Sequence, residues 1–124
     1  MKILIAEDES KLLESLQAYF KAAGHTVAGT ETGQGAIDAL RADAPDVLLL
    51  DMWLKDAVSG LQVLKEAKQI APKTTVIVIT GLEEESIEEE ALKLGASSLL
   101  RKPIRLDELE QLVVQASQAR QLPK

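Results

Sequence analysis

The feature that most constrains this chain is the uninterrupted apolar run Val47-Leu48-Leu49-Leu50, which ends in Asp51. Such a run has no polar face to turn toward water, so it predicts a strand buried on both sides in the middle of a parallel sheet. In open sheets of this kind, ligands bind beyond the carboxyl ends of the strands. Asp51 is therefore predicted to lie at the binding edge, although taken alone it could equally be a polar strand end or a helix cap.

Other segments of the chain alternate between the two regular patterns. Apolar residues recur at helical spacing between the strand segments, Thr32 is predicted to cap the second helix, and Gly24 to end the first. Asp107 and Glu110 resemble a capping box in front of a last helix. The pattern predicts an α/β fold, a doubly wound five-stranded parallel sheet with helices on both faces. Besides the run at 47–51, the predicted strands cover residues 3–6, 26–28, 75–80 and 97–101.

Length and charge limit what the protein can be. The 124 residues suit one domain over residues 1–120, with residues 121–124 as a tail or the start of a linker. The net charge of −6 argues against direct binding to nucleic acid or to an anionic membrane. The absence of cysteine and the single His25 argue against thiolate metal sites and Ser/His/Asp triads. No signal-peptide pattern or membrane-length apolar run occurs, so we expect a cytoplasmic protein.

Right-handed crossovers place the carboxyl ends of all five predicted strands on one edge of the sheet. Five polar residues are delivered to that edge: Glu7, Asp8, Asp51, Thr80 and Lys102. Three carboxylates without a counter-charge repel one another, and Mg²⁺ is the cation that best suits oxygen ligands beside a phosphate. A hydroxyl and an ammonium group suit the oxygens of a phosphoryl group, so Asp51 is predicted to be a nucleophile that forms an aspartyl phosphate. Each residue singly also has a structural explanation, as a helix cap, a strand end or a solvated side chain.

This set of residues, with Gly60, Gly95-Ala96 and Pro103, resembles the motifs of the receiver domains of two-component response regulators. The resemblance covers essentially the whole chain. It implies the flavodoxin-like strand order 2-1-3-4-5. It also implies a signalling domain that catalyses only its own phosphorylation and dephosphorylation.

The resemblance further assigns roles to the site residues. Asp51 is implied to accept a phosphoryl group from a histidine kinase or a phosphotransfer protein, with Thr80 and Lys102 assisting. Asp8, Asp51 and the backbone carbonyl of Trp53 are implied to bind Mg²⁺, with Glu7 acting through a metal-bound water. Phosphorylation is implied to pull Thr80 inward and to expose a surface of the fourth helix, fifth strand and fifth helix, which a homodimer could use.

The chain departs from the family pattern in several places. Leu99 stands where relatives commonly have an aromatic residue that follows the threonine inward, so the usual readout is missing. The loop of residues 52–59 is longer than common and lacks a proline, so we expect it to be mobile. Trp53 and Leu82 flank the path that a hydrolytic water takes in the family, which predicts slow loss of the phosphoryl group.

A dense acidic run covers residues 83–85 and 88–90. We interpret it first as a solvated face whose charges favour a helix N-terminus. The alternative is a surface that repels a second copy or attracts a basic partner.

The output stays open at the level of sequence. The chain could be the amino-terminal part of a larger transcription regulator, or a stand-alone receiver that serves a phosphorelay or binds a partner. A phosphate-independent interaction module and a metal-dependent phosphotransfer enzyme are the two alternatives from other classes.

Overall fold

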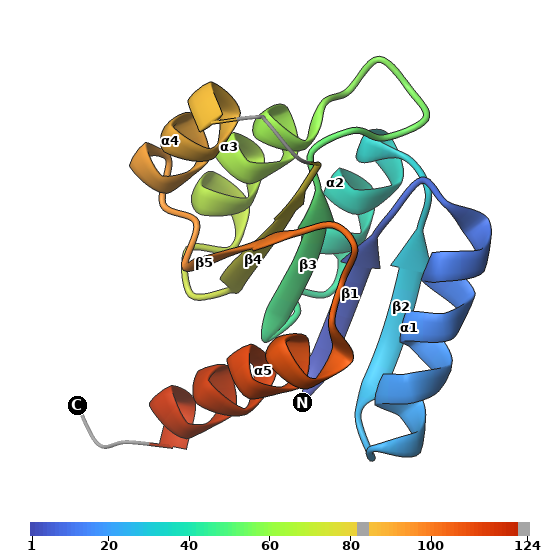
Figure 1. The fold of residues 1–124 in the computed structure, drawn as a ribbon. Coiled ribbons are helices and arrows are strands. Elements are labelled where there is room, and N and C mark those ends of the chain that lie inside the picture. Colours follow the sequence, from blue (N-terminus) through green and yellow to red (C-terminus); the bar gives the residue numbers. More distant parts are fainter. Residues whose placement is uncertain (82–84, 122–124) are drawn as a thin grey trace.

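The computed structural model describes residues 1–81 and 85–121, and in this part five strands alternate with five helices (Figure 1). All strand pairings are parallel and the strand order is β2-β1-β3-β4-β5, which confirms the predicted doubly wound fold. The strands are β1 (Lys2–Ala6), β2 (Thr26–Thr30), β3 (Val47–Asp51), β4 (Thr75–Thr80) and β5 (Ser98–Arg101). The helices are α1 (Ser10–Ala22), α2 (Gly33–Ala42), α3 (Gly60–Ile70), α4 (Glu85–Lys93) and α5 (Leu106–Gln121).

The helices form two layers, one on each face of the sheet (Figure 1). Side chains alternate between the two faces of a strand, so Leu48 and Leu50 of β3 pack toward α2 and α3, whereas Val47 and Leu49 pack toward α1 and α5. α4 joins the first layer through Ala91. The central strands are buried on both faces, as the aliphatic run predicted. A polar side chain introduced into them would have no contact with water.

The edges of the sheet are more polar and less buried than its centre. β2 is largely exposed and runs two residues further than predicted, to Thr30, because it stays paired with β1 up to Ala6. β5 begins at Ser98, one residue later than predicted. Both edge strands end beside the polar edge that carries the predicted site.

The helix boundaries confirm two of the three predicted signals. Thr32 caps α2 by accepting a hydrogen bond from Gly35 N at 3.0 Å, and Gly24 follows α1 with a φ of 97°, which a glycine adopts without steric cost. The predicted capping box is wrong. Leu109 N donates to Arg105 O at 3.1 Å, so α5 begins at Leu106 and Asp107 lies inside its first turn.

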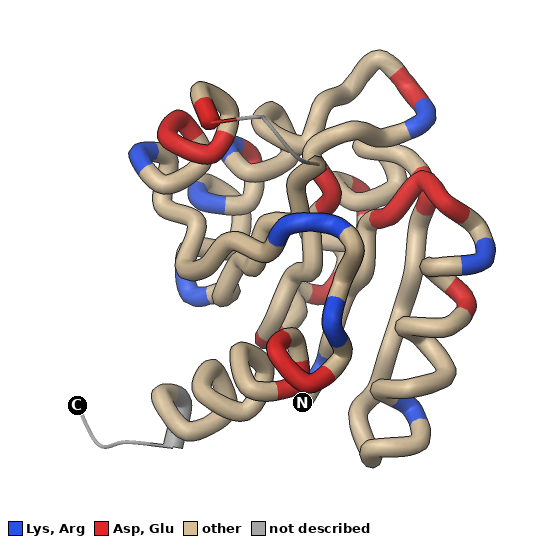
Figure 2. The backbone as a smooth tube through the Cα atoms, viewed as in Figure 1, with Lys and Arg blue, Asp and Glu red and all other residues tan. Residues whose placement is uncertain are grey.

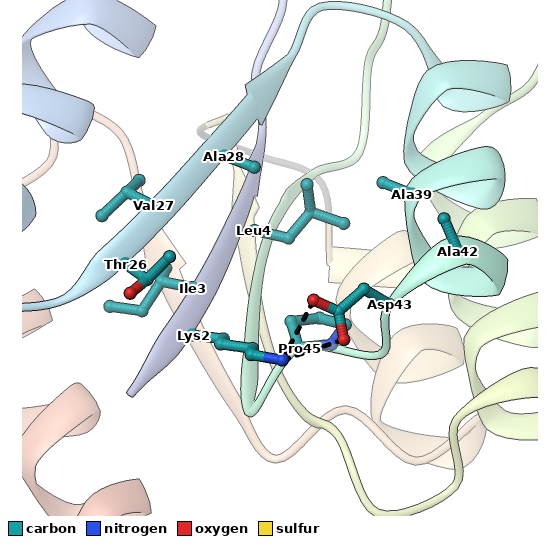
Figure 3. Close-up of a pocket in the computed structure, with 10 residues that line it drawn as sticks. All are labelled: Lys2, Ile3, Leu4, Thr26, Val27, Ala28, Ala39, Ala42, Asp43 and Pro45. Atoms are coloured by element: carbon teal, nitrogen blue, oxygen red, sulfur yellow. Dashed lines mark hydrogen bonds and ion pairs between the residues drawn. The ribbon is translucent and has the colours of Figure 1, made fainter.

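An apolar cavity of about 240 Å³ lies between β1, β2 and α2, where Leu4, Val27 and Ala39 line it (Figure 3). Lys2 and Asp43 form an ion pair at its rim, with Lys2 Nζ 2.9 Å from Asp43 Oδ1 (Figure 3). The cavity lies toward the amino-terminal ends of the strands, so it is separate from the edge on which Asp51 lies. Within the described residues, no helix is long and apolar enough to cross a membrane.

Candidate functional site

The structure brings three of the predicted carboxylates together at the carboxyl ends of neighbouring strands. β1 and β3 pair through Ala6 and Leu50, so the residues that follow, Glu7 and Asp51, are neighbours. One ligand oxygen from each of Glu7, Asp8 and Asp51 lies within 4.8 Å of the others. Glu7 is fully buried and Asp51 is 2% exposed. Glu7 and Asp51 therefore have little water to screen their charges, whereas Asp8 is partly exposed.

Lys102 supplies the positive charge in contact with this cluster. Its Nζ atom lies 3.0 Å from Asp51 Oδ2, 3.3 Å from Glu7 Oε2 and 3.1 Å from Glu9 Oε1. Burial by itself would lower the pKa of Lys102, but the carboxylates raise it well above its ordinary value. Lys102 is thus a permanent cation at neutral pH. Figure 2 shows the acidic residues after β1 and the basic pair at the end of β5 at the same edge of the sheet.

One ammonium group does not balance the acidic cluster. Burial, followed by the charge of Asp51, raises the pKa of Glu7 from 4.5 to about 8, despite a hydrogen bond that Glu7 accepts from Glu9 N at 2.9 Å. Burial also raises the pKa of Asp51. Glu7 Oε1 is buried without a hydrogen-bond partner among the described residues. A proton or a cation at this position would remove the unfavourable charge, so the donor set fits a hard divalent cation such as Mg²⁺.

The carboxylate of Asp51 is oriented on both sides. Trp53 N donates to Asp51 Oδ1 at 3.1 Å, while Lys102 holds Oδ2. The indole of Trp53 is 54% exposed, so this side chain is not part of the core. The role of the Trp53 carbonyl as a metal ligand stays a prediction.

Gly60 allows the loop that follows Asp51 to pass close to the end of β3. A Cβ atom at this position would lie 2.5 Å from both Asp51 O and Met52 Cα. These are backbone atoms that cannot move without displacing the end of β3, so only glycine fits. Gly60 N also donates to Met52 O at 3.0 Å, which closes the loop at its base.

The loop of residues 52–59, predicted to be mobile, makes several contacts with the neighbouring β2–α2 connection. Asp56 accepts hydrogen bonds from Gly33 N at 2.8 Å and from Gln34 N at 2.9 Å, and these bonds lower its pKa. Lys55 pairs with Glu31 through its side chain and its backbone N–H. Since Asp56 satisfies two free N–H groups at the start of α2, these contacts oppose the predicted mobility.

Thr80 lies at the end of β4 and is fully buried, and its hydroxyl forms a hydrogen bond to α4. Thr80 Oγ1 donates to Glu88 Oε2 at 3.0 Å. Arg101 binds the same carboxylate through two nitrogens of its guanidinium group. Nε lies 2.9 Å from Oε2 and Nη2 lies 2.8 Å from Oε1. We call these three residues the Thr80–Glu88–Arg101 network.

The network corrects the interpretation of the acidic run as a solvated face. Glu88 is only 8% exposed, and its pairing with Arg101 lowers its pKa. Glu85, Glu89 and Glu90 are exposed as predicted, whereas Glu83 and Glu84 lie outside the described residues, as does Leu82. The sequence does not show which glutamate of the run is buried, because it does not specify which side of α4 faces the sheet.

Sequence reasoning therefore missed three residues near the site, Glu9, Glu88 and Arg101. Arg101 and Thr80 are partners across β4 and β5. Had the register of the two strands been known, this pairing would have pointed to Arg101. Glu9 directly follows Asp8, but its contact with Lys102 depends on how the β5–α5 connection passes the start of α1.

The model of the response regulator receiver domain family matches residues 3–114, and the chain belongs to this family. It is similar to the regulatory protein AtoC of Escherichia coli K12, at 32% identity over 99% of this chain and 26% of AtoC. It is also similar to a cyclic di-GMP phosphodiesterase of Thermotoga maritima, at 29% identity over 94% of this chain and 31% of that protein. The chain thus spans less than a third of the length of these two relatives.

The fold is also close to that of solved receiver domains. The receiver domain of NtrX from Brucella abortus superposes with a TM-score of 0.85 at 27% identity, covering 92% of this chain and 96% of that domain. Fold and sequence thus agree on a receiver domain of two-component signalling, and the acidic cluster is typical of the Mg²⁺ site of this family.

Proposed function

We propose that this chain accepts a phosphoryl group on Asp51 in a Mg²⁺-dependent reaction and passes the state of a histidine kinase or phosphotransfer protein to an output. The observation that carries the proposal is the buried carboxylate of Asp51, 2% exposed and held 3.0 Å from Lys102 Nζ within a cluster of three carboxylates. Burial favours a carboxylate whose charge is offset, and a bound divalent cation beside Lys102 provides that charge both before and after a phosphoryl group is added. We place the reaction in the cytoplasm.

In the proposed reaction an oxygen of the Asp51 carboxylate attacks phosphorus. The new O–P bond forms as the P–N bond of the donor phosphohistidine breaks, and the imidazole leaves with the bonding electron pair. Lys102 donates to the phosphoryl oxygens, as the ammonium group already contacts Asp51. Asp8, Asp51, the carbonyl of Trp53 and, through water, Glu7 would hold Mg²⁺. When bound, this ion would neutralise charge that develops on the phosphoryl oxygens.

The chemistry in this proposal is confined to the domain itself. No outside substrate is turned over, because the phosphoryl group is only gained and lost on Asp51. We infer that the output belongs to a larger protein, as the similarity to part of the longer regulatory protein AtoC supports, and we propose transcription control as its form. The stand-alone receiver is the alternative. Exposed apolar side chains on α4 and α5, Leu92 at 51%, Leu106 at 43% and Val114 at 46%, support a homodimer through α4, β5 and α5.

The direct test is incubation with acetyl phosphate and Mg²⁺, followed by intact mass and gel-filtration volume. We expect the wild type to gain one phosphoryl group only when Mg²⁺ is present, and Asp51→Ala to gain none. Asp38→Ala, which removes an exposed carboxylate from α2, is the matched control and should be labelled like the wild type. A smaller elution volume after labelling would support the dimer. An unlabelled wild type would point instead to a phosphate-independent interaction module.

Trp53 is expected to slow the loss of the phosphoryl group. Its large side chain follows Asp51 by two residues, and it is half exposed beside the predicted path of the hydrolytic water. Trp53→Ala should therefore lose its phosphoryl group several-fold faster than the wild type, measured as the decay of the phosphorylated mass after the donor is removed. An unchanged half-life would mean that the indole does not obstruct the water.

A further inference from the structure

We propose that Glu88 and Arg101 are positioning residues that keep the Thr80 hydroxyl bonded to α4, withhold it from a phosphoryl group on Asp51, and so weaken the binding of that group. The inference rests on the proposed function and adds to it the side chains that oppose phosphorylation. It concerns the Thr80–Glu88–Arg101 network, which lies beside the acidic cluster and shares no carboxylate with it.

First, the Thr80 hydroxyl has a single proton, and this proton can form only one strong hydrogen bond at a time. This proton is donated to Glu88 Oε2 at 3.0 Å, in surroundings where Thr80 is fully buried. A hydroxyl has one proton to donate, so Thr80 cannot donate to Glu88 and to a phosphoryl oxygen on Asp51 at once. Phosphorylation must therefore break the Thr80–Glu88 bond before Thr80 can contribute to the site.

The second step is the geometry that makes Glu88 a strong acceptor. Arg101 binds both oxygens of the carboxylate at 2.8 and 2.9 Å, a bidentate arrangement that fixes the position and the charge of Glu88. The backbone of Arg101 is in turn fixed by the sheet, because Arg101 pairs with Thr80 across β4 and β5. The acceptor is thus pre-positioned, and the Thr80 hydroxyl bonds to an ionised group rather than to water.

The third step is the connection to the rest of the molecule. Glu88 belongs to α4, and Arg101 directly precedes Lys102, which contacts Asp51. Release of Thr80 therefore changes contacts on α4 and at the end of β5 together. Leu99, two residues before Arg101 on β5, is aliphatic and packs against the core, so the polar network provides a link between site and surface that an aromatic residue does not provide here.

The test compares Glu88→Ala with its matched control Glu89→Ala. Both variants remove one glutamate from α4, but Glu89 is exposed and lies outside the network. Beryllofluoride with Mg²⁺, a mimic of the phosphoryl group, is titrated into each protein by calorimetry. Glu88→Ala should bind it roughly tenfold more tightly than the wild type, within the usual range of coupling between sites, and Glu89→Ala should bind like the wild type.

A double-mutant cycle with Thr80→Val separates positioning from charge. If Glu88 acts through the hydroxyl, Glu88→Ala should have no effect on affinity once Thr80 is valine, whereas a purely electrostatic effect of Glu88 would persist. Glu88→Gln, which keeps the volume of the side chain, should give a smaller gain in the same direction and replaces Glu88→Ala if that variant does not fold.

The outcomes of the two hypotheses differ. A wild type that binds beryllofluoride while Glu88→Ala and Glu89→Ala do not differ would overturn the positioning role alone. An effect of Glu88→Ala that survives in Thr80→Val would overturn it as well. A wild type that does not bind beryllofluoride at all would overturn the proposed function, and the inference with it.

Discussion

Replacing Lys102 by methionine is expected to lower the free energy of unfolding by about 3 kcal/mol at pH 8 in buffer without divalent ions, since removing one partner of a buried ion pair typically costs this much. Methionine keeps the length of the side chain and removes its charge. The side chain of Lys102 is only 24% exposed, and its Nζ contacts Glu7, Glu9 and Asp51. Without this cation the buried carboxylates repel one another with little water between them.

The same variant should respond more strongly to magnesium. Lys102 and a metal ion compete for the carboxylate of Asp51, so Mg²⁺ should restore much of the lost stability in Lys102→Met and bind more tightly than in the wild type. Urea unfolding with and without Mg²⁺ measures both effects. Lys55→Met is the matched control, because the side chain of Lys55 is 52% exposed in its pair with Glu31. An exposed pair contributes little, so this variant should stay within about 1 kcal/mol of the wild type. Equal losses in the two variants would contradict the prediction.

Stability in metal-free buffer is expected to fall by about 1.5 kcal/mol between pH 6.5 and 8, at up to about 1.4 kcal/mol per pH unit. The cause is Glu7, whose pKa rises from 4.5 to about 8 on folding through burial and the charge of Asp51. In this range the folded protein keeps a proton that the unfolded chain has lost. The stability that this proton provides is complete below pH 4.5 and is lost as the pH rises through 8.

The pKa shifts of other groups determine the pH range in which the effect of Glu7 can be measured. Burial raises the pKa of Asp51 as well, and Lys102 stays charged throughout. Burial lowers the pKa of His25 below 6.5, which gives a slope of the opposite sign at lower pH. Asp8, also in the cluster, has a lowered pKa and is ionised above pH 6.5. The effect of Glu7 is therefore best measured above pH 6.5.

Chemical denaturation at several pH values tests this prediction. Glu7→Gln cannot ionise and should show a nearly flat profile between pH 6.5 and 8. Saturating Mg²⁺ should also remove the decline in the wild type, because the ion binds the ionised carboxylates. Glu14→Gln, a substitution at an exposed glutamate of α1, should keep the slope. A slope that persists in Glu7→Gln would assign the titration to another group.

Much of the fold follows from local patterns in the sequence. The aliphatic runs at β3 and β4 have no polar face, and this predicts central strands of a parallel sheet, as the structure confirms. The strand order was predicted only through the resemblance to receiver domains, because periodicity alone does not say which strands are neighbours. The start of α5 was predicted wrongly, since a capping signal in the sequence competes with the path that the chain takes out of β5.

The acidic cluster was predicted because each of its members ends a strand or follows one within two residues. In a parallel sheet all carboxyl ends share one edge, so position in the sequence translates into position in space. The same rule placed Lys102 at that edge, and Lys102 contacts Asp51 in the structure. It does not give the direction of a side chain, and the contact of Glu9 with Lys102 was missed for that reason.

The sequence by itself determined which groups reach the edge of the sheet, because strand ends are encoded by local hydrophobicity and the topology gathers them. Only the tertiary structure decided which partner each group has. Thr80 donates to Glu88 of α4, because the phase of α4 and the register between β4 and β5 bring Glu88 and Arg101 to its hydroxyl. Hydrogen bonds between distant segments depend on distances of a few tenths of an ångström, and no periodicity in the sequence specifies these.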